Sequence, residues 1–243
     1  MKNHDGITQL IGRLSNKIYI VECGDELVVV DPGMPSDHRR LFNRIRSLGR
    51  SPRDVTAIVL THFHVDHAGS AARLKEISNA KLYVHAEDAP YLKGEKSMPS
   101  VFNAGVQGRA LMLLPNTVEK YSQVPPVEAD VSFSHGDVLP LLGGLVAFHA
   151  PGHTPGSSVF LWRDRGVLFT GDAIQNLYFM LTLPEPGFCW DLPLAGRSAA
   201  KVIEALADED YRVICAGHGP IVRSSAPEKM ARFDASIHRR GKA

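Results

Sequence analysis

The sequence predicts an α+β fold in a single domain, residues 1–243, in which short strands alternate with amphipathic helices. The chain has 243 residues, 44% of them hydrophobic, which is enough to bury a large core as one domain. Short apolar runs bounded by glycine, proline and polar turn residues predict strands. Longer stretches with apolar residues three and four positions apart predict helices. No internal repeat, low-complexity tract or linker divides the chain.

The first half of the chain opens with strands and then alternates helices with strands. The expected strands cover 7–11, 17–22, 26–30, 56–60 and 81–84, and the expected helices cover 37–48, 68–77 and about 86–92. In 37–48 the apolar residues Leu41, Phe42 and Ile45 recur at helical spacing with basic residues between them. This helix is therefore expected to pack on a core with its basic face in solvent.

The second half contains a second group of strands, followed by two helices. The expected strands cover 131–133, 138–141, 145–148, 157–162, 167–170 and 213–216, and the expected helices cover 193–206 and 227–237. Two stretches, 94–126 and 175–192, lack a clear period but carry apolar and aromatic residues such as Met98, Phe102, Phe179 and Trp190. Such long connections are interpreted as active-site walls, or else as cover for a core edge or a dimer contact.

Metal-ligand side chains gather directly after the strand at 56–60. His62, His64, Asp66 and His67 fall within six residues. Alternate residues of an extended segment point the same way, so His62 and His64 can converge on one ion. Asp66 by itself could be a helix N-cap. Three imidazoles and a carboxylate in one loop, however, need a compensating cation, and the sequence therefore predicts a metal site.

Further ligands are expected downstream, since four residues cannot complete two coordination shells. His153 lies in a Pro-Gly-rich turn, and Asp172 and His218 follow the strands at 167–170 and 213–216. Each stands beside or near a glycine, which lets the backbone approach closely. Each could also be only a turn residue, but with the first motif they form one constellation.

This pattern resembles the metallo-β-lactamase superfamily over nearly the whole chain, including the strand and turn at 28–33. The resemblance implies an αββα sandwich, in which two facing mixed β-sheets are covered by helices. It also implies two divalent metal ions, zinc first, with iron or manganese also suited to histidine and carboxylate ligands. The implied ligands are His62, His64 and His153 for one metal, Asp66, His67 and His218 for the other, and Asp172 as the bridge.

Other residues take secondary roles in this interpretation. Asp31 resembles the carboxylate that orients a ligand histidine in the family, although it could be a plain Asp-Pro turn. Tyr178 is a candidate for a hydrogen bond to a substrate carbonyl, because it closely follows Asp172. Three histidines are surplus to the implied ligand set and are interpreted as structural: His85, His135 and His149.

The implied chemistry is hydrolysis. Two cations roughly 3.5–4 Å apart lower the pKa of a bridging water toward neutrality, and the resulting hydroxide attacks a carbonyl or phosphoryl centre. Asp66 or Asp172 would then pass a proton to the leaving group. Lactamases of the superfamily typically carry cysteine or serine at the bridging position, and glyoxalase II adds a helical domain that 219–243 is too short to form. The expected reaction is cleavage of a small ester, thioester or lactone; the alternatives are phosphodiester hydrolysis and a non-catalytic metal-binding module.

The charge balance, the apolar runs and the cysteines restrict which molecules the protein is expected to bind and where it is expected to be located. The net charge is +1, from 27 basic and 26 acidic side chains, which gives no electrostatic case for nucleic acid or an acidic membrane. No apolar run is long enough to span a bilayer, and the first residues lack the apolar segment of a signal peptide. Three widely spaced cysteines, Cys23, Cys189 and Cys215, suggest no disulfide framework. We therefore expect a small-molecule substrate and a cytoplasmic location, with a homodimer left open.

Overall fold

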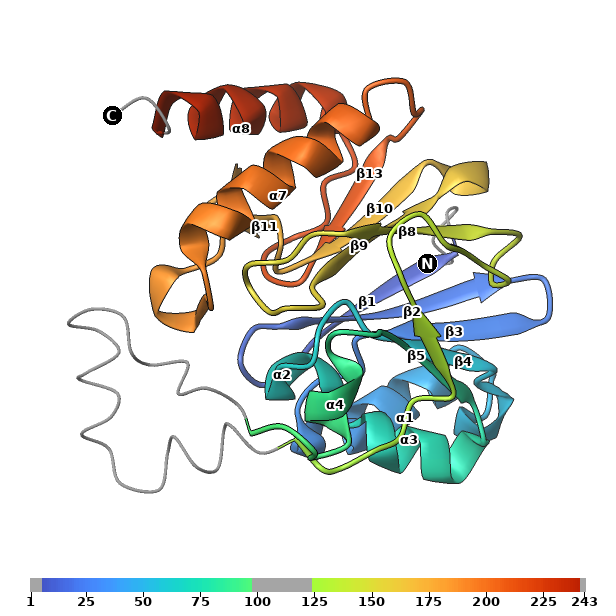
Figure 1. Ribbon diagram of the computed structural model, residues 1–243. Coiled ribbons are helices and arrows are strands. Elements are labelled where there is room, and N and C mark those ends of the chain that lie inside the picture. The colour runs from blue at the N-terminus through green and yellow to red at the C-terminus, as the bar shows by residue number, and fades with distance from the viewer. Residues whose placement is uncertain (1–5, 98–123, 241–243) are drawn as a thin grey trace.

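The computed structural model describes residues 6–97 and 124–240 and forms four layers, helix–sheet–sheet–helix (Figure 1). In Figure 1, helices α1 and α3 lie below the first sheet, and α7 and α8 lie above the second. This is the predicted αββα sandwich, and each layer follows from which faces of the strands and helices are apolar.

The first sheet has the strand order β1-β2-β3-β4-β5-β6. Its strands are β1 (Ile7–Ile11), β2 (Lys17–Cys23), β3 (Glu26–Val30), β4 (Ala57–Val59), β5 (Lys81–His85) and β6 (Val131–Phe133). The first three pair in antiparallel fashion, and β3 to β6 run parallel to one another. The parallel strands bring their carboxyl ends, and the loops that follow them, to one edge of the sheet.

The second sheet has the order β13-β10-β9-β8-β7. Its strands are β7 (Val138–Leu139), β8 (Leu145–His149), β9 (Ser158–Trp162), β10 (Val167–Gly171) and β13 (Val213–Ala216). Only β10 and β13 are parallel; the other pairs are antiparallel. A separate hairpin joins β11 (Gln175–Leu177) to β12 (Met180–Thr182).

The helices cover the outer faces of the two sheets. The α-helices are α1 (His38–Ser47), α2 (Val65–Ala68), α3 (Ala71–Ser78), α4 (Ala89–Leu92), α7 (Leu192–Ala205) and α8 (Ala226–Arg240). Short 3₁₀ helices are η1 (Pro35–Asp37), η2 (Pro52–Asp54), η3 (Arg163–Arg165) and η4 (Pro186–Phe188). As expected, α1 buries Leu41, Phe42 and Ile45 and leaves its arginines outside.

Three apolar cores hold the layers together, and β3 contributes to two of them. Val28 and Val30 point into the core between the two sheets, whereas Val29 points into the core between the first sheet and the helices α1 and α3. This alternation follows from the period of two along a strand. A third core lies between the second sheet and the helices α7 and α8. Burial on both faces explains why the central strands are continuous apolar runs.

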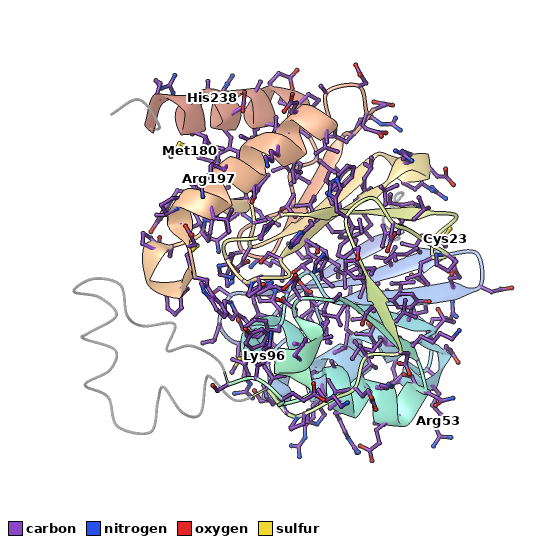
Figure 2. All side chains as sticks on the ribbon, viewed as in Figure 1. Cys23, Arg53, Lys96, Met180, Arg197 and His238 are labelled. Atoms are coloured by element: carbon purple, nitrogen blue, oxygen red, sulfur yellow. The ribbon has the colours of Figure 1, made fainter. Side chains whose placement is uncertain are left out.

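The structure differs most from the predicted elements in two places; in addition, the helix expected over 86–92 is shortened to α4, and the strand expected over 138–141 is shortened to β7. The helix expected over 68–77 is split into α2 and α3, because Gly69 lies against Pro35 and Ser70 donates a hydrogen bond to the carbonyl of Met34. The stretch 175–192, which has no clear period, contains the β11–β12 hairpin (Figure 2, where Met180 is labelled). Of the other stretch without a period, residues 98–123, with Met98 and Phe102, lie outside the described residues.

Two further expectations can be compared with the structure. Cys215 is buried in β13, as predicted. Within residues 6–97 and 124–240, no helix combines the length and the apolarity that crossing a membrane would require.

Candidate metal centre

The predicted metal ligands stand on loops at one edge of the sandwich. His62 and His64 follow β4, Asp66 and His67 lie in α2, and His153 lies between β8 and β9. Asp172 directly follows β10, and His218 lies two residues after the end of β13. Backbone hydrogen bonds hold these loops together: Ser158 N–H donates to the Thr61 carbonyl at 2.9 Å, and Gly217 N–H to the Gly171 carbonyl at 2.7 Å. Segments far apart in the chain therefore meet here.

The first group of candidate ligands consists of three imidazoles, those of His62, His64 and His153, whose nearest nitrogens lie within 4.8 Å of one another. His153 Nε2 lies 2.9 Å from His64 Nδ1 and 3.2 Å from His62 Nε2. Burial, followed by the neighbouring imidazoles, lowers the pKa of His64 to about 3. Burial also lowers the pKa of His153, to about 4. These rings are therefore neutral at physiological pH, the state in which imidazole binds a metal.

The second group consists of Asp66, His67 and His218. His218 Nε2 lies 3.3 Å from Asp66 Oδ2, and His67 Nε2 lies 3.6 Å from the same oxygen. Burial alone would lower the pKa of His67, but the carboxylates of Asp66, Asp172 and Asp31 outweigh it and raise that pKa to about 10. The carboxylates thus stabilise a positive charge at this position, which a proton or a metal cation can supply.

Asp172 lies between the two groups. Its Oδ2 is 3.5 Å from His153 Nε2 and 3.4 Å from His218 Nε2, and its Oδ1 is 3.6 Å from His67 Nε2. One carboxylate therefore approaches histidines of both groups, as the bridging interpretation requires.

The residues present fit divalent metal ions. The donor set combines imidazole nitrogens with carboxylate oxygens, which zinc, iron and manganese all accept. His67 Nε2 and Asp172 Oδ1 are both buried without a hydrogen-bond partner. Buried polar atoms are ordinarily satisfied, so these two atoms, which lie 3.6 Å apart, indicate a missing electrophile.

Asp31 holds His67 and Thr61 in place beside the centre. Its side chain is 2% exposed and accepts hydrogen bonds from the Thr61 N–H at 2.8 Å, the Thr61 hydroxyl at 2.6 Å and His67 Nδ1 at 2.9 Å. When His67 is neutral, as it would be with a metal bound, a proton fixed on Nδ1 leaves the Nε2 lone pair directed at the centre. The oxygens of Asp31 are occupied by these donors, so we interpret it as orienting His67 and not as a ligand.

Three residues at the centre were missed by sequence reasoning. Asn16 donates to the Asp66 carbonyl at 2.6 Å and pairs its backbone with His218. Gln175 donates to Asp172 Oδ2 at 2.9 Å. Asp88 accepts hydrogen bonds from loops on both sides of the three-histidine group. In the sequence, Asn16 is only a turn residue, Gln175 lies in a stretch without period, and Asp88 resembles a helix cap.

The remaining candidates are Tyr178 and the three histidines that are interpreted as structural. Tyr178 sits at the tip of the β11–β12 hairpin with 89% of its surface exposed, so its contact with a substrate stays a prediction. The rings of His85 and His149 stack with centroids 3.9 Å apart, and the His149 N–H donates to His135 Nδ1. Among the described residues, none of these three histidines belongs to a metal-ligand group.

An αββα sandwich with a histidine- and aspartate-rich centre at its loop edge defines a class of metal-binding proteins. The chain belongs to the metallo-beta-lactamase superfamily, whose family model matches residues 11–218. Most members of this superfamily are metal-dependent hydrolases.

Similar proteins agree with this assignment. A probable metallo-hydrolase of Bacillus subtilis, YflN, is 29% identical over 177 residues, which are 70% of this chain and 64% of that protein. The hydroxyacylglutathione hydrolase GloC of Haemophilus influenzae is 29% identical over 151 residues, 60% of each chain. The metallo-beta-lactamase family protein TTHA1429 of Thermus thermophilus superposes with a TM-score of 0.70 at 23% identity, covering 97% of this chain and 80% of that one. The structural likeness indicates the shared fold.

Proposed function

We propose that this protein is a hydrolase that uses two divalent metal ions, zinc first, to cleave a small ester, thioester or lactone. The observation that carries the proposal is the position of Asp172, whose carboxylate approaches histidines of both ligand groups. In this assignment His62, His64 and His153 would hold one ion, Asp66, His67 and His218 would hold the other, and Asp172 would be shared between them. When bound, such ions supply an acidified water and a Lewis acid for the substrate carbonyl.

Asp66 is the residue to which we assign proton transfer. Its side chain is 19% exposed, whereas that of Asp172 is 6% exposed, so a leaving group can reach Asp66 more readily. In the metal-free protein, burial would raise the pKa of Asp66, but the positive charge on His67 and His218 outweighs it and lowers the pKa. In the assigned site a metal cation would supply that positive charge and keep the carboxylate ionised, so that it can take a proton and return it to the departing oxygen or sulfur.

The segment 175–190 supports a small apolar acyl substrate. It leaves the centre at Gln175, which binds Asp172, and returns where the Trp190 N–H donates to the His153 carbonyl at 3.2 Å. Between these anchors it exposes five large apolar side chains: Tyr178, Phe179, Met180, Phe188 and Trp190. Apolar surface beside a few polar anchors suits a small molecule better than a polyanion. The name of the relative GloC, a hydroxyacylglutathione hydrolase, also favours an acyl compound.

A hydrolysis screen on zinc-, iron- and manganese-loaded protein tests the proposal. The panel contains lactones, thioesters, aryl esters and bis-aryl phosphodiesters, with metal content measured on the same samples. We expect turnover of an acyl substrate, and its loss in Asp66→Asn protein that retains metal. Turnover of the phosphodiester alone would favour the phosphodiesterase alternative. Metal-loaded protein without any turnover would favour a binding module.

A further inference from the structure

Asp88 is a buried carboxylate with no role in its own helix. It occupies the N-cap position of α4, where aspartate usually accepts a hydrogen bond from the first turn, yet its side chain makes no such bond. It is 0% exposed. Its oxygens instead accept hydrogen bonds from the Phe63 N–H at 3.1 Å, the Thr154 hydroxyl at 2.8 Å and the Gly156 N–H at 2.6 Å.

These donors lie on the two loops that carry the three-histidine group. Phe63 separates His62 from His64, and Thr154 directly follows His153. We propose that Asp88 is a positioning residue, which clamps these two loops together and so sets the spacing of the three imidazoles for their metal ion. The inference rests on the proposed function, in which these imidazoles hold one of the two ions.

The Asp88 carboxyl depends on these hydrogen bonds, because it is fully buried. Burial, only partly offset by the hydrogen bonds from Thr154, Gly156 and Phe63, raises the pKa of Asp88 to about 7. A buried carboxyl is costly unless its partners compensate for lost water. The loop at Gly156 approaches so closely that a Cβ there would lie 2.6 Å from Asp88 Cγ. Glycine at 156 is thus a requirement of the clamp.

The clamp acts on one half of the centre. The Asp88 side chain accepts its hydrogen bonds from Phe63, Thr154 and Gly156. The other half is tied by Asn16, which binds the carbonyl of Asp66 and pairs with His218. Loss of Asp88 should therefore weaken one ion selectively, whereas a general loss of stability would weaken both.

The test is a chelator-competition titration of metal-free wild-type and Asp88→Asn protein with Zn²⁺. Asparagine has the same shape as aspartate, but its NH₂ group would face the N–H of either Phe63 or Gly156, so that one of these hydrogen bonds is lost. We expect the affinity for one ion to fall by roughly 10–100-fold, the range typical of residues that support metal ligands, and the affinity for the other to stay unchanged. Co²⁺-substituted protein should show a changed visible absorption for the affected ion only.

Two further variants make the test specific. Asp130→Asn is the matched control, because Asp130 accepts hydrogen bonds from Leu82 N–H and Lys75 Nζ at the opposite end of β5; it should bind both ions as the wild type does. Thr154→Val removes the hydrogen bond from the Thr154 hydroxyl and leaves Asp88 in place, so it serves as the test if Asp88→Asn does not fold. It should weaken binding of the same ion to a smaller extent.

The outcomes separate the two proposals. Wild-type protein that binds two ions, with Asp88→Asn and Thr154→Val binding both equally well, would overturn the clamp and leave the proposed function intact. Equal weakening of both ions in Asp88→Asn and Thr154→Val would also overturn it. Wild-type protein that binds no metal would remove the proposed function itself.

Discussion

Replacing Asp31 with asparagine isolates the effect of one carboxylate on the metal centre. Asp31 has a left-handed backbone, with φ of 53°, and asparagine tolerates this conformation as well as aspartate does. The substitution therefore adds no backbone strain, whereas alanine would. It removes only the charge and one of the two acceptor oxygens.

The loss of metal affinity in Asp31→Asn can be estimated from the hydrogen bonds of Asp31. The asparagine oxygen can keep the Thr61 N–H, but its NH₂ group then faces His67 Nδ1, which is 2.9 Å from the Asp31 carboxylate. His67 must give up its Nδ1 proton to accept this donor, and a proton on Nε2 would point at the centre. A lost hydrogen bond to a charged group is worth about 1.5–3 kcal/mol. This corresponds to metal binding weakened by roughly 10–100-fold.

Competition for Zn²⁺ with a chromogenic chelator at neutral pH measures this loss directly. Asp130→Asn again serves as the control, because Asp130 lies at the far end of β5 and binds Leu82 and Lys75. Unchanged affinity in Asp31→Asn, measured on correctly folded protein, would refute the orienting role of Asp31.

Four further outcomes are expected. Asp172→Ala should lose metal and activity together, by at least about 10–100-fold; elemental analysis showing full metal content would contradict this. His149→Ala should keep its metal while His153→Ala loses it, and equal loss in both would show the ligand assignment near Pro151 to be wrong. In the metal-free protein, burial raises the pKa of Asp88 from 3.8 to about 7, so the folded state keeps a proton that the unfolded chain releases. The unfolding free energy of the wild type relative to Asp88→Asn should thus fall between about pH 4 and 7, by on the order of 4 kcal/mol, in urea titrations; a rise would refute it. The kcat/KM for the best acyl substrate should vary little with salt, because few charges steer it, and faster, salt-sensitive turnover of a short RNA would overturn the acyl preference.

The strands were predictable because their patterns are local. The run Val28-Val29-Val30 has the apolar continuity of a strand buried on both faces, and β3 has the bounds that this pattern predicts. The hairpin β11–β12 has no comparable signal. Its turn consists of Tyr178 and Phe179, both left-handed with φ of 50° and 63°, where asparagine and glycine would ordinarily mark the turn.

The candidate ligands can be picked out in the sequence, but the residues that support them cannot. Histidines and aspartates at strand ends are visible one by one, and the geometry brings them together as the resemblance implies. Asp88 and Asn16 resemble a helix cap and a turn residue because their partners, such as Gly156 and Asp66, lie 68 and 50 positions away along the chain. Only the folded arrangement of the loops shows which atoms they bind.

The central claim is that one carboxylate, Asp172, joins two metal sites. Elemental analysis of protein purified without chelator and reconstituted with Zn²⁺ tests it most directly. The arrangement of ligands predicts close to two metal ions per chain in the wild type and a clear loss in Asp172→Ala. A reproducible value of one ion or fewer in the reconstituted wild type would contradict the claim.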